Sequence, residues 1–174
     1  MVHTRKLPTS LAGTPPFRFY DRRVEPLPVV DDHARVIAAA PDRTWQALVD
    51  VLGGFPALPG VLTSAWGLDP AVGSGRIGPA PGDAVPGFAV VAVDPPRTLT
   101  LRGRHRFSRY ELRFSLEATA GRTDLHARTA AVFPGLLGGG YRLLVIGSGG
   151  HVLAVRRLLA QVARRAESGG RAEP

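Results

Sequence analysis

Three consecutive segments between residues 99 and 133 alternate apolar and polar side chains, and no other feature constrains the fold as strongly. In residues 99–107 the odd-numbered positions are apolar or small apart from one histidine, and the even-numbered positions are mostly threonine and arginine. Residues 110–116 and 125–133 continue the alternation. A period of two residues is that of a strand with one buried face, and such sheets are typically antiparallel. We therefore expect neighbouring antiparallel strands.

Two more strands and a helix are predicted before these segments. Residues 33–39 are expected to open the fold as a strand, and residues 88–93 are continuously apolar up to a Pro-Pro turn. Between them, a helix is predicted from Pro41, a residue that suits the first helical turn, to the glycine pair at 53–54. Its apolar face consists of Trp45, Leu48, Val49 and Leu52, at helical spacing.

A long helix is predicted at the C-terminal end of the chain. It runs from about Tyr141 to Ala166, where apolar residues recur along one face. Upstream, residues 53–87 are so rich in glycine and proline that only short strands fit, around residues 62–66 and 76–77.

This order of elements predicts an α+β fold, in which a curved antiparallel sheet of about six or seven strands wraps around the long C-terminal helix. A single helix cannot fill the concave side of such a sheet, so we expect an internal cavity. The domain is expected to span residues 33–167. A Pro-rich N-terminal arm, residues 1–32, precedes it, and a disordered tail, residues 168–174, follows it.

Composition excludes several classes of site. The chain has no cysteine, so disulfides, thiolate metal sites and cysteine nucleophiles are excluded. Its five histidines show no metal-ligand spacing. The G-x-G-x-x-G match at Gly73–Gly78 is followed by Pro79, which does not suit the helix that a dinucleotide site needs. We therefore expect neither a metal nor a cofactor.

The chain shows no membrane-spanning or secretory pattern. No apolar run reaches about 18 residues, the length of a transmembrane helix, and the N-terminus has no signal-peptide core. This favours a cytoplasmic protein. The net charge of +8 comes from 21 arginines and one lysine. Because the chain is also rich in alanine, glycine and proline, which share GC-rich codons with arginine, we consider nucleic-acid binding unlikely.

The predicted concave face supplies the candidate ligand-binding residues. They are His105, Phe107, Tyr110, Thr129, Gly147, Ser148 and His151. His105 is either a core histidine hydrogen-bonded to a neighbour or a group that orients a ligand or transfers a proton. The glycines at 147–150 either mark a helix kink or leave room for a ligand beside His151. We expect no carboxylate on the inward face, which argues against hydrolysis by paired carboxylates.

Three stretches of the chain resemble the START-like superfamily, also called SRPBCC or helix-grip. They read HARVIAAAPDRTWQALVDV, PGFAVVAVDPPRTLTLRGRHRFSRYELRFSLE and FPGLLGGGYRLLVIGSGGH. The resemblance covers residues 33–167 and is to a bacterial, polyketide cyclase-like and lipid-binding-like branch. It implies a helix-grip fold around a cavity, since members share a cavity more than a catalytic motif.

Three functions follow from these features. The first, which we favour, is binding of a small hydrophobic molecule, such as a lipid, polyketide or isoprenoid, in an internal cavity. The second is an aromatase/cyclase-type enzyme with His105 and Tyr110 or His151 as general acid–base groups. The third is an interaction module whose arginine-rich outer face holds nucleic acid or an acidic partner. The oligomeric state stays open.

Overall fold

The described strands form one six-stranded antiparallel sheet. The computed structural model describes residues 26–54, 64–71, 80–85 and 87–169. The sheet order is β1-β6-β5-β4-β3-β2, and every neighbouring pair is antiparallel. The strands are β1 (Val29–Ile37), β2 (Ala84–Val85), β3 (Phe88–Asp94), β4 (Thr98–His105), β5 (Ser108–Thr119) and β6 (Arg122–Val132).

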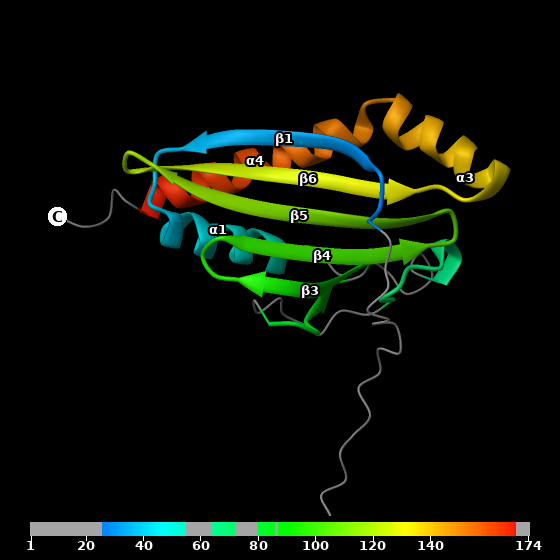
Figure 1. Cartoon of the computed structure of the whole chain (residues 1–174), viewed down its shortest axis with the longest axis horizontal. Helices are drawn as coiled ribbons and strands as arrows, with labels where there is room; N and C mark the ends of the chain where they lie inside the picture. The colour runs from blue at the N-terminus through cyan, green and yellow to red at the C-terminus, as the bar shows by residue number, and fades with distance from the viewer. Residues whose placement is uncertain (1–25, 55–63, 72–79, 86, 170–174) are drawn as a thin grey trace, which may run out of the picture.

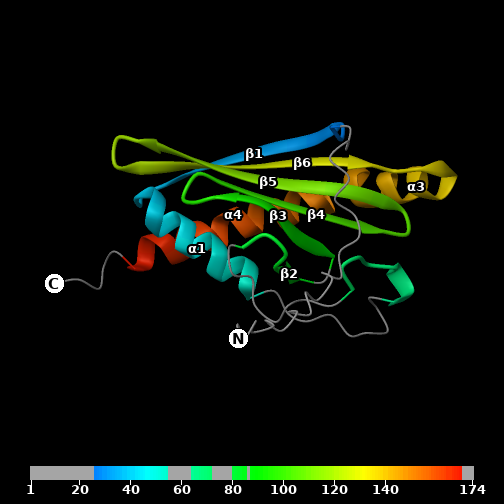
Figure 2. The same ribbon diagram turned by 60° about the horizontal axis from the view of Figure 1, so that its bottom comes forward.

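Two helices cover one face of this sheet. They are α1 (Pro41–Gly53), between β1 and β2, and α4 (Gly150–Ser168), at the end of the chain. Figures 1 and 2 show them side by side across the same face, and they contact each other as well as the strands. The curved sheet that grips a C-terminal helix is the predicted α+β helix-grip architecture, which is confirmed.

A third helical segment leads from β6 into α4. It consists of α3 (Gly135–Arg142) and a π-helical stretch, η1 (Leu143–Gly147). Figures 1 and 2 show α3 extending past the end of β6, away from the sheet. The single helix predicted from Tyr141 is therefore divided, because Gly149 adopts a left-handed φ of 73° that glycine tolerates without strain. Of the two roles considered for these glycines, the break in the helix is observed.

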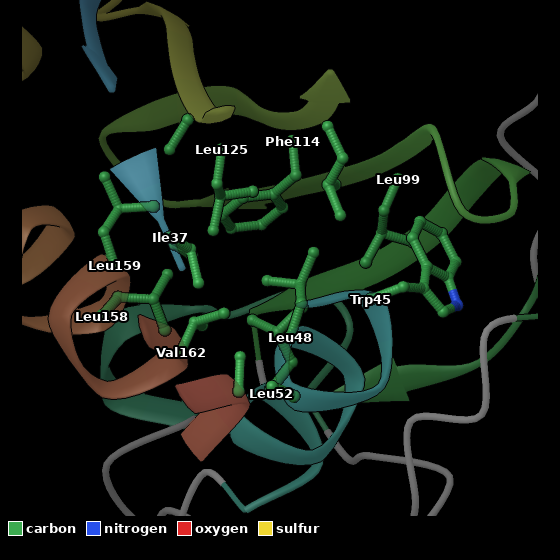
Figure 3. Packing of buried hydrophobic residues seen from close by; sticks show 14 of the residues in the cluster. Ile37, Trp45, Leu48, Leu52, Leu99, Phe114, Leu125, Leu158, Leu159 and Val162 are labelled. Atoms are coloured by element: carbon green, nitrogen blue, oxygen red, sulfur yellow. The ribbon is translucent and has the colours of Figure 1, made fainter. Parts of the chain in front are cut away.

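The core lies between the sheet and the two helices α1 and α4. Figure 3 shows Phe114 of β5 and Leu99 of β4 facing Leu48 of α1. All three side chains are fully buried. Burial of one such side chain stabilises the fold by about 1.5–3 kcal/mol. From α4, the buried residues are Val155, Leu158, Leu159, Val162, Ala163 and Ala166.

Some element boundaries differ from the sequence expectation. β1 begins at Val29, so it includes four residues that were assigned to the N-terminal arm. Residues 64–66 form a helical turn, so the strand predicted around 62–66 is wrong there. α4 continues to Ser168, one residue into the predicted tail. The strand predicted at 76–77, the motif at 73–78, and residues 1–25, 62–63 and 170–174 lie outside the described residues.

Candidate functional site

The inward face of the sheet changes character along its strands. At the core, a cross-strand row of Leu99, Phe114 and Ala127 is fully buried. Two residues further along, roughly 7 Å, the row is Leu101, Leu112, Thr129 and Asp31. Still further are Tyr110 beside Ala131 and then His105 opposite Ser108. Polar and aromatic side chains thus collect at the end of the sheet where α3 begins.

An aromatic group surrounds His105 at this end. We define the aromatic group as Trp66, His105, Phe107, Tyr110 and Tyr141. The ring centroids of His105 and Tyr141 lie 4.6 Å apart, edge to face, and Phe107 stacks on Tyr141 at 5.7 Å. Trp66 approaches Tyr141 edge-on at 6.0 Å. The structure therefore brings together three predicted residues and adds two that the sequence did not single out.

Both ring nitrogens of His105 are hydrogen-bonded to neighbours. The backbone N–H of Phe107 donates to Nδ1 at 3.1 Å, and Nε2 lies 2.9 Å from Oγ of Ser108. Because Nδ1 accepts, the neutral ring carries its proton on Nε2 and donates it to Ser108. Burial lowers the pKa of His105, which favours this neutral form. The hydrogen-bonded histidine considered in the sequence is the arrangement observed.

Tyr110 is fixed by a close backbone approach. Its hydroxyl donates to the carbonyl of Gly87 at 2.7 Å. Burial raises the pKa of Tyr110, and the nearby Tyr141 and Asp69 raise it further, so the hydroxyl stays protonated at neutral pH. Gly103 lies directly beneath, where an added Cβ would fall 1.7 Å from the Gly87 oxygen. The absence of a side chain at 103 is what lets this tyrosine lie flat against the sheet.

A second polar group lies across the sheet, where β1 and β6 meet α4. We define the acid–histidine group as Asp31, His33, Thr129 and His151. His151 Nε2 lies 3.1 Å from Thr129 Oγ1 and 3.3 Å from Asp31 Oδ2, and His33 Nε2 lies 3.6 Å from the same Oδ2. Both carboxylate oxygens of Asp31 are buried and have no hydrogen-bond partner within the described part of the chain. A buried carboxylate beside two imidazoles is suited to holding a proton.

The expectation that no carboxylate faces inward is wrong. Asp31 and His33 alternate with Ile37 on the same side of β1, and Ile37 is fully buried in the core. Asp31 and His33 precede Ile37 by six and four residues, even numbers that put all three on one face of a strand. The sequence expectation began this strand only at His33, which left Asp31 in the arm.

Gly147 and Ser148 belong to neither group. Gly147 is exposed, and an added Cβ there would meet open space. Ser148 is also exposed, and its Oγ accepts a hydrogen bond from the N–H of Gly150 at 3.3 Å. They lie at the junction between η1 and α4. A role for them in ligand binding stays a prediction, as does the internal cavity.

The outer face of the sheet carries a polar hollow of about 580 Å³. It contains Arg113 and Arg128, which lie directly opposite each other on β5 and β6. Its remaining lining residues are Asp32, Arg97, Thr98, Ser115, Leu116, Glu117 and His126. Further along the same face Arg102 pairs with Glu111, and Arg104 with Asp69. This hollow lies on the opposite face from the aromatic and acid–histidine groups.

Two kinds of feature are absent from the described residues. These residues contain no cluster of three or more histidine, aspartate or glutamate side chains arranged to hold a metal ion. Nor does any helix among them have the length and apolar character needed to cross a bilayer.

Solved structures of low sequence identity resemble this chain, and the first of those named here, with a TM-score of 0.50, supports the shared fold. Protein Ms6760 from Mycobacterium smegmatis is 14% identical, with a TM-score of 0.50 over 82% of this chain and 99% of that one. CalU16 from Micromonospora echinospora is 17% identical, with a TM-score of 0.46 over 79% and 83%. Protein CV1439 from Chromobacterium violaceum is 15% identical, with a TM-score of 0.46 over 76% and 96%. At these identities the likeness concerns the fold alone. No curated protein matches the chain.

A family model covers most of the chain. The model described as polyketide cyclase / dehydrase and lipid transport matches residues 32–167, which include all six strands except the first residues of β1, together with α1, α3 and nearly all of α4. The match agrees with the START-like resemblance of the sequence. This chain belongs to the polyketide cyclase / dehydrase and lipid transport family.

Proposed function

We propose that this protein binds a small, largely apolar molecule against the inward face of the sheet, between the aromatic group and the acid–histidine group. The observation that carries the proposal is their spacing. Tyr110 and Thr129 stand on neighbouring strands, one cross-strand row apart, which is roughly 7 Å along the strand. A molecule the size of one or two fused rings would touch both groups at once.

The two groups suit different parts of such a molecule. The rings of Phe107 and Tyr141 are half-buried and offer faces and edges for stacking. Asp31 and His151 offer hydrogen-bonding atoms in a buried setting, where a hydroxyl or carbonyl of the ligand replaces the bonds that it loses to water. The ligand class is therefore an apolar ring system with a polar end, which agrees with the family description.

Binding is tested with a fluorescent apolar probe, N-phenyl-naphthylamine, and by native mass spectrometry of freshly purified protein. We expect a co-purified apolar mass and probe binding. Tyr141→Ala should weaken the probe affinity roughly fivefold to tenfold through loss of ring contacts. The matched control is Val36→Ala, an exposed apolar residue of β1 outside both groups. If the wild type binds neither a co-purified molecule nor the probe, the proposal is wrong.

A second candidate function is acid–base catalysis of the aromatase/cyclase type. It is favoured by the 3.3 Å separation of His151 Nε2 from Asp31 Oδ2. His105 and Tyr110, the other candidates from the sequence, already use their polar atoms in hydrogen bonds. A carboxylate beside His151 stabilises the imidazolium that forms when the ring removes a proton from a carbon between two carbonyls.

This candidate is tested with a poly-β-keto thioester as substrate. His151→Gln should lower the rate of ring closure about a hundredfold or more and leave probe binding nearly unchanged. The matched control is His126→Gln, because His126 lies 3.7 Å from Asp32 on the outer face and repeats the pairing outside the site. Equal rates in both variants would exclude His151 as the catalytic group and leave the binding proposal standing.

A further inference from the structure

Four leucines of α3 and η1 are exposed to an unusual degree. Leu136, Leu137, Leu143 and Leu144 have between 68% and 96% of their surface accessible. They fall at i, i+1, i+7 and i+8, which places them on one face of a continuous helical segment. We call this set the leucine face. Contiguous apolar patches are rare on soluble monomers and mark surfaces that contact a protein or a membrane.

The opposite side of α3 is anchored to the domain. Gly138 is buried so closely that an added Cβ would fall 2.6 Å from the backbone of Phe133. Tyr141 stacks on Phe107 at 5.7 Å. These contacts hold the leucine face turned away from the body of the protein, and Figures 1 and 2 show α3 standing clear of the sheet. The exposure of the leucines therefore follows from how the helix is seated.

The leucine face lies in a stretch of the chain that carries cations and no acidic residue. Residues 125–166 contain six arginines and no aspartate or glutamate. Arg142 lies within the segment itself and is exposed, and Arg106 is exposed on the β4–β5 turn, whose Phe107 packs against α3. A second copy of the chain would bring the same cations to a two-fold contact, where they repel. A partner surface that has an apolar layer beneath a negatively charged one fits the leucine face and these arginines better than a second copy does.

We propose that α3 and η1 dock this protein on an anionic lipid bilayer. The leucine face enters the boundary between headgroups and acyl chains, and Arg142 contacts lipid phosphates. Trp66, 43% exposed, contacts Tyr141 of α3 edge-on and suits the headgroup level. This attachment is to the surface of the bilayer and does not depend on the ligand proposed for the inward face.

The test is co-flotation of the full-length protein with vesicles of phosphatidylcholine and phosphatidylglycerol in equal parts. We expect the wild type to float with these vesicles and to bind pure phosphatidylcholine more weakly. Replacing all four leucines by glutamine should lower the partition coefficient at least about tenfold, because burial of the apolar face provides the affinity. Arg142→Gln should lower it about fivefold on the anionic vesicles only.

The matched control is Val36→Gln, which makes an exposed apolar side chain polar and should bind like the wild type. Val36 pairs with Asp124 near the start of β6, whereas α3 follows the end of that strand. Circular dichroism checks that each variant is folded. If the variant with all four leucines replaced does not fold, the double variant Leu136→Gln with Leu137→Gln is used instead, since these two leucines are the most exposed. Unchanged vesicle binding in the leucine variant overturns the proposal. So does a wild-type dimer in light scattering that the leucine replacements convert to a monomer.

Discussion

Single residues without a side chain set the geometry of the aromatic group. Gly103 has no room for a Cβ, which would meet the Gly87 oxygen at 1.7 Å and a ring carbon of Tyr110 at 2.7 Å. Gly103→Ala must therefore push Tyr110 from its hydrogen bond, and we expect a loss of about 1–3 kcal/mol in the free energy of unfolding. Urea denaturation measures it. Gly169→Ala, where the added methyl meets open space, is the control; equal stability of the two variants would contradict the close packing at Gly103.

The protonation of His105 links the same group to pH. Burial lowers its pKa below the ordinary value of 6.5, so the unfolded chain binds this proton more readily than the folded one. Stability from this group is therefore present above about pH 6.5 and is lost as the pH falls below that value through the lower pKa of the folded state. We expect wild type to lose more unfolding free energy than His105→Asn between about pH 7 and about pH 5. Parallel pH profiles of the two proteins would show that His105 is not the group involved.

At the scale of elements, the glycines of α3 separate into two kinds. Gly138 is pressed against the Phe133 backbone, whereas Gly140 faces open space in the same helix. Gly140→Ala should stabilise α3 by about 0.5–1 kcal/mol, because glycine is a poor helix former. Gly138→Ala should instead unseat the helix. Hydrogen exchange of the α3 amides measures both effects: protection should rise in the first variant and fall in the second, and the same sign in both would refute this seating of α3.

The elements that the sequence predicted best are those whose local pattern agrees with their packing. Helix α1 begins at Pro41 and buries Trp45, Leu48 and Leu52, as its spacing indicated. The helix was predicted to begin only at about Tyr141, but α3 already begins at Gly135, in a glycine-rich stretch that by itself disfavours a helix. What overrides that preference is tertiary contact: only glycine fits against Phe133 at position 138. A close packing contact of this kind leaves no periodic trace in the sequence.

At the scale of the whole molecule, the candidate site depends on pairing between the two ends of the chain. β1 lies beside β6, so Asp31 meets Thr129 across the sheet, and α4 then brings His151 onto both. The sequence pattern placed Thr129 and His151 on inward faces, but it did not predict that Asp31 lies beside them. Nearly a hundred residues separate Asp31 from its partner Thr129 in the chain. The register of β1 against β6 buries the carboxylate of Asp31, a residue that the sequence assigned to the arm.

This long-range pairing gives a test of where the folded unit begins. We compare a chain that starts at Pro26 with one that starts at His33, the boundary expected from the sequence. The shorter chain lacks Val29, Asp31 and Asp32, which pair with residues 128–130 of β6. Because each lost backbone hydrogen bond is worth about 0.5–1.5 kcal/mol, we expect the shorter chain to be about 2–4 kcal/mol less stable in urea denaturation. Its probe affinity should fall as well, since Asp31 is gone. If both chains unfold at the same urea concentration, residues 29–32 are not part of the stable sheet, and Asp31 is then not held beside His151 in the acid–histidine group.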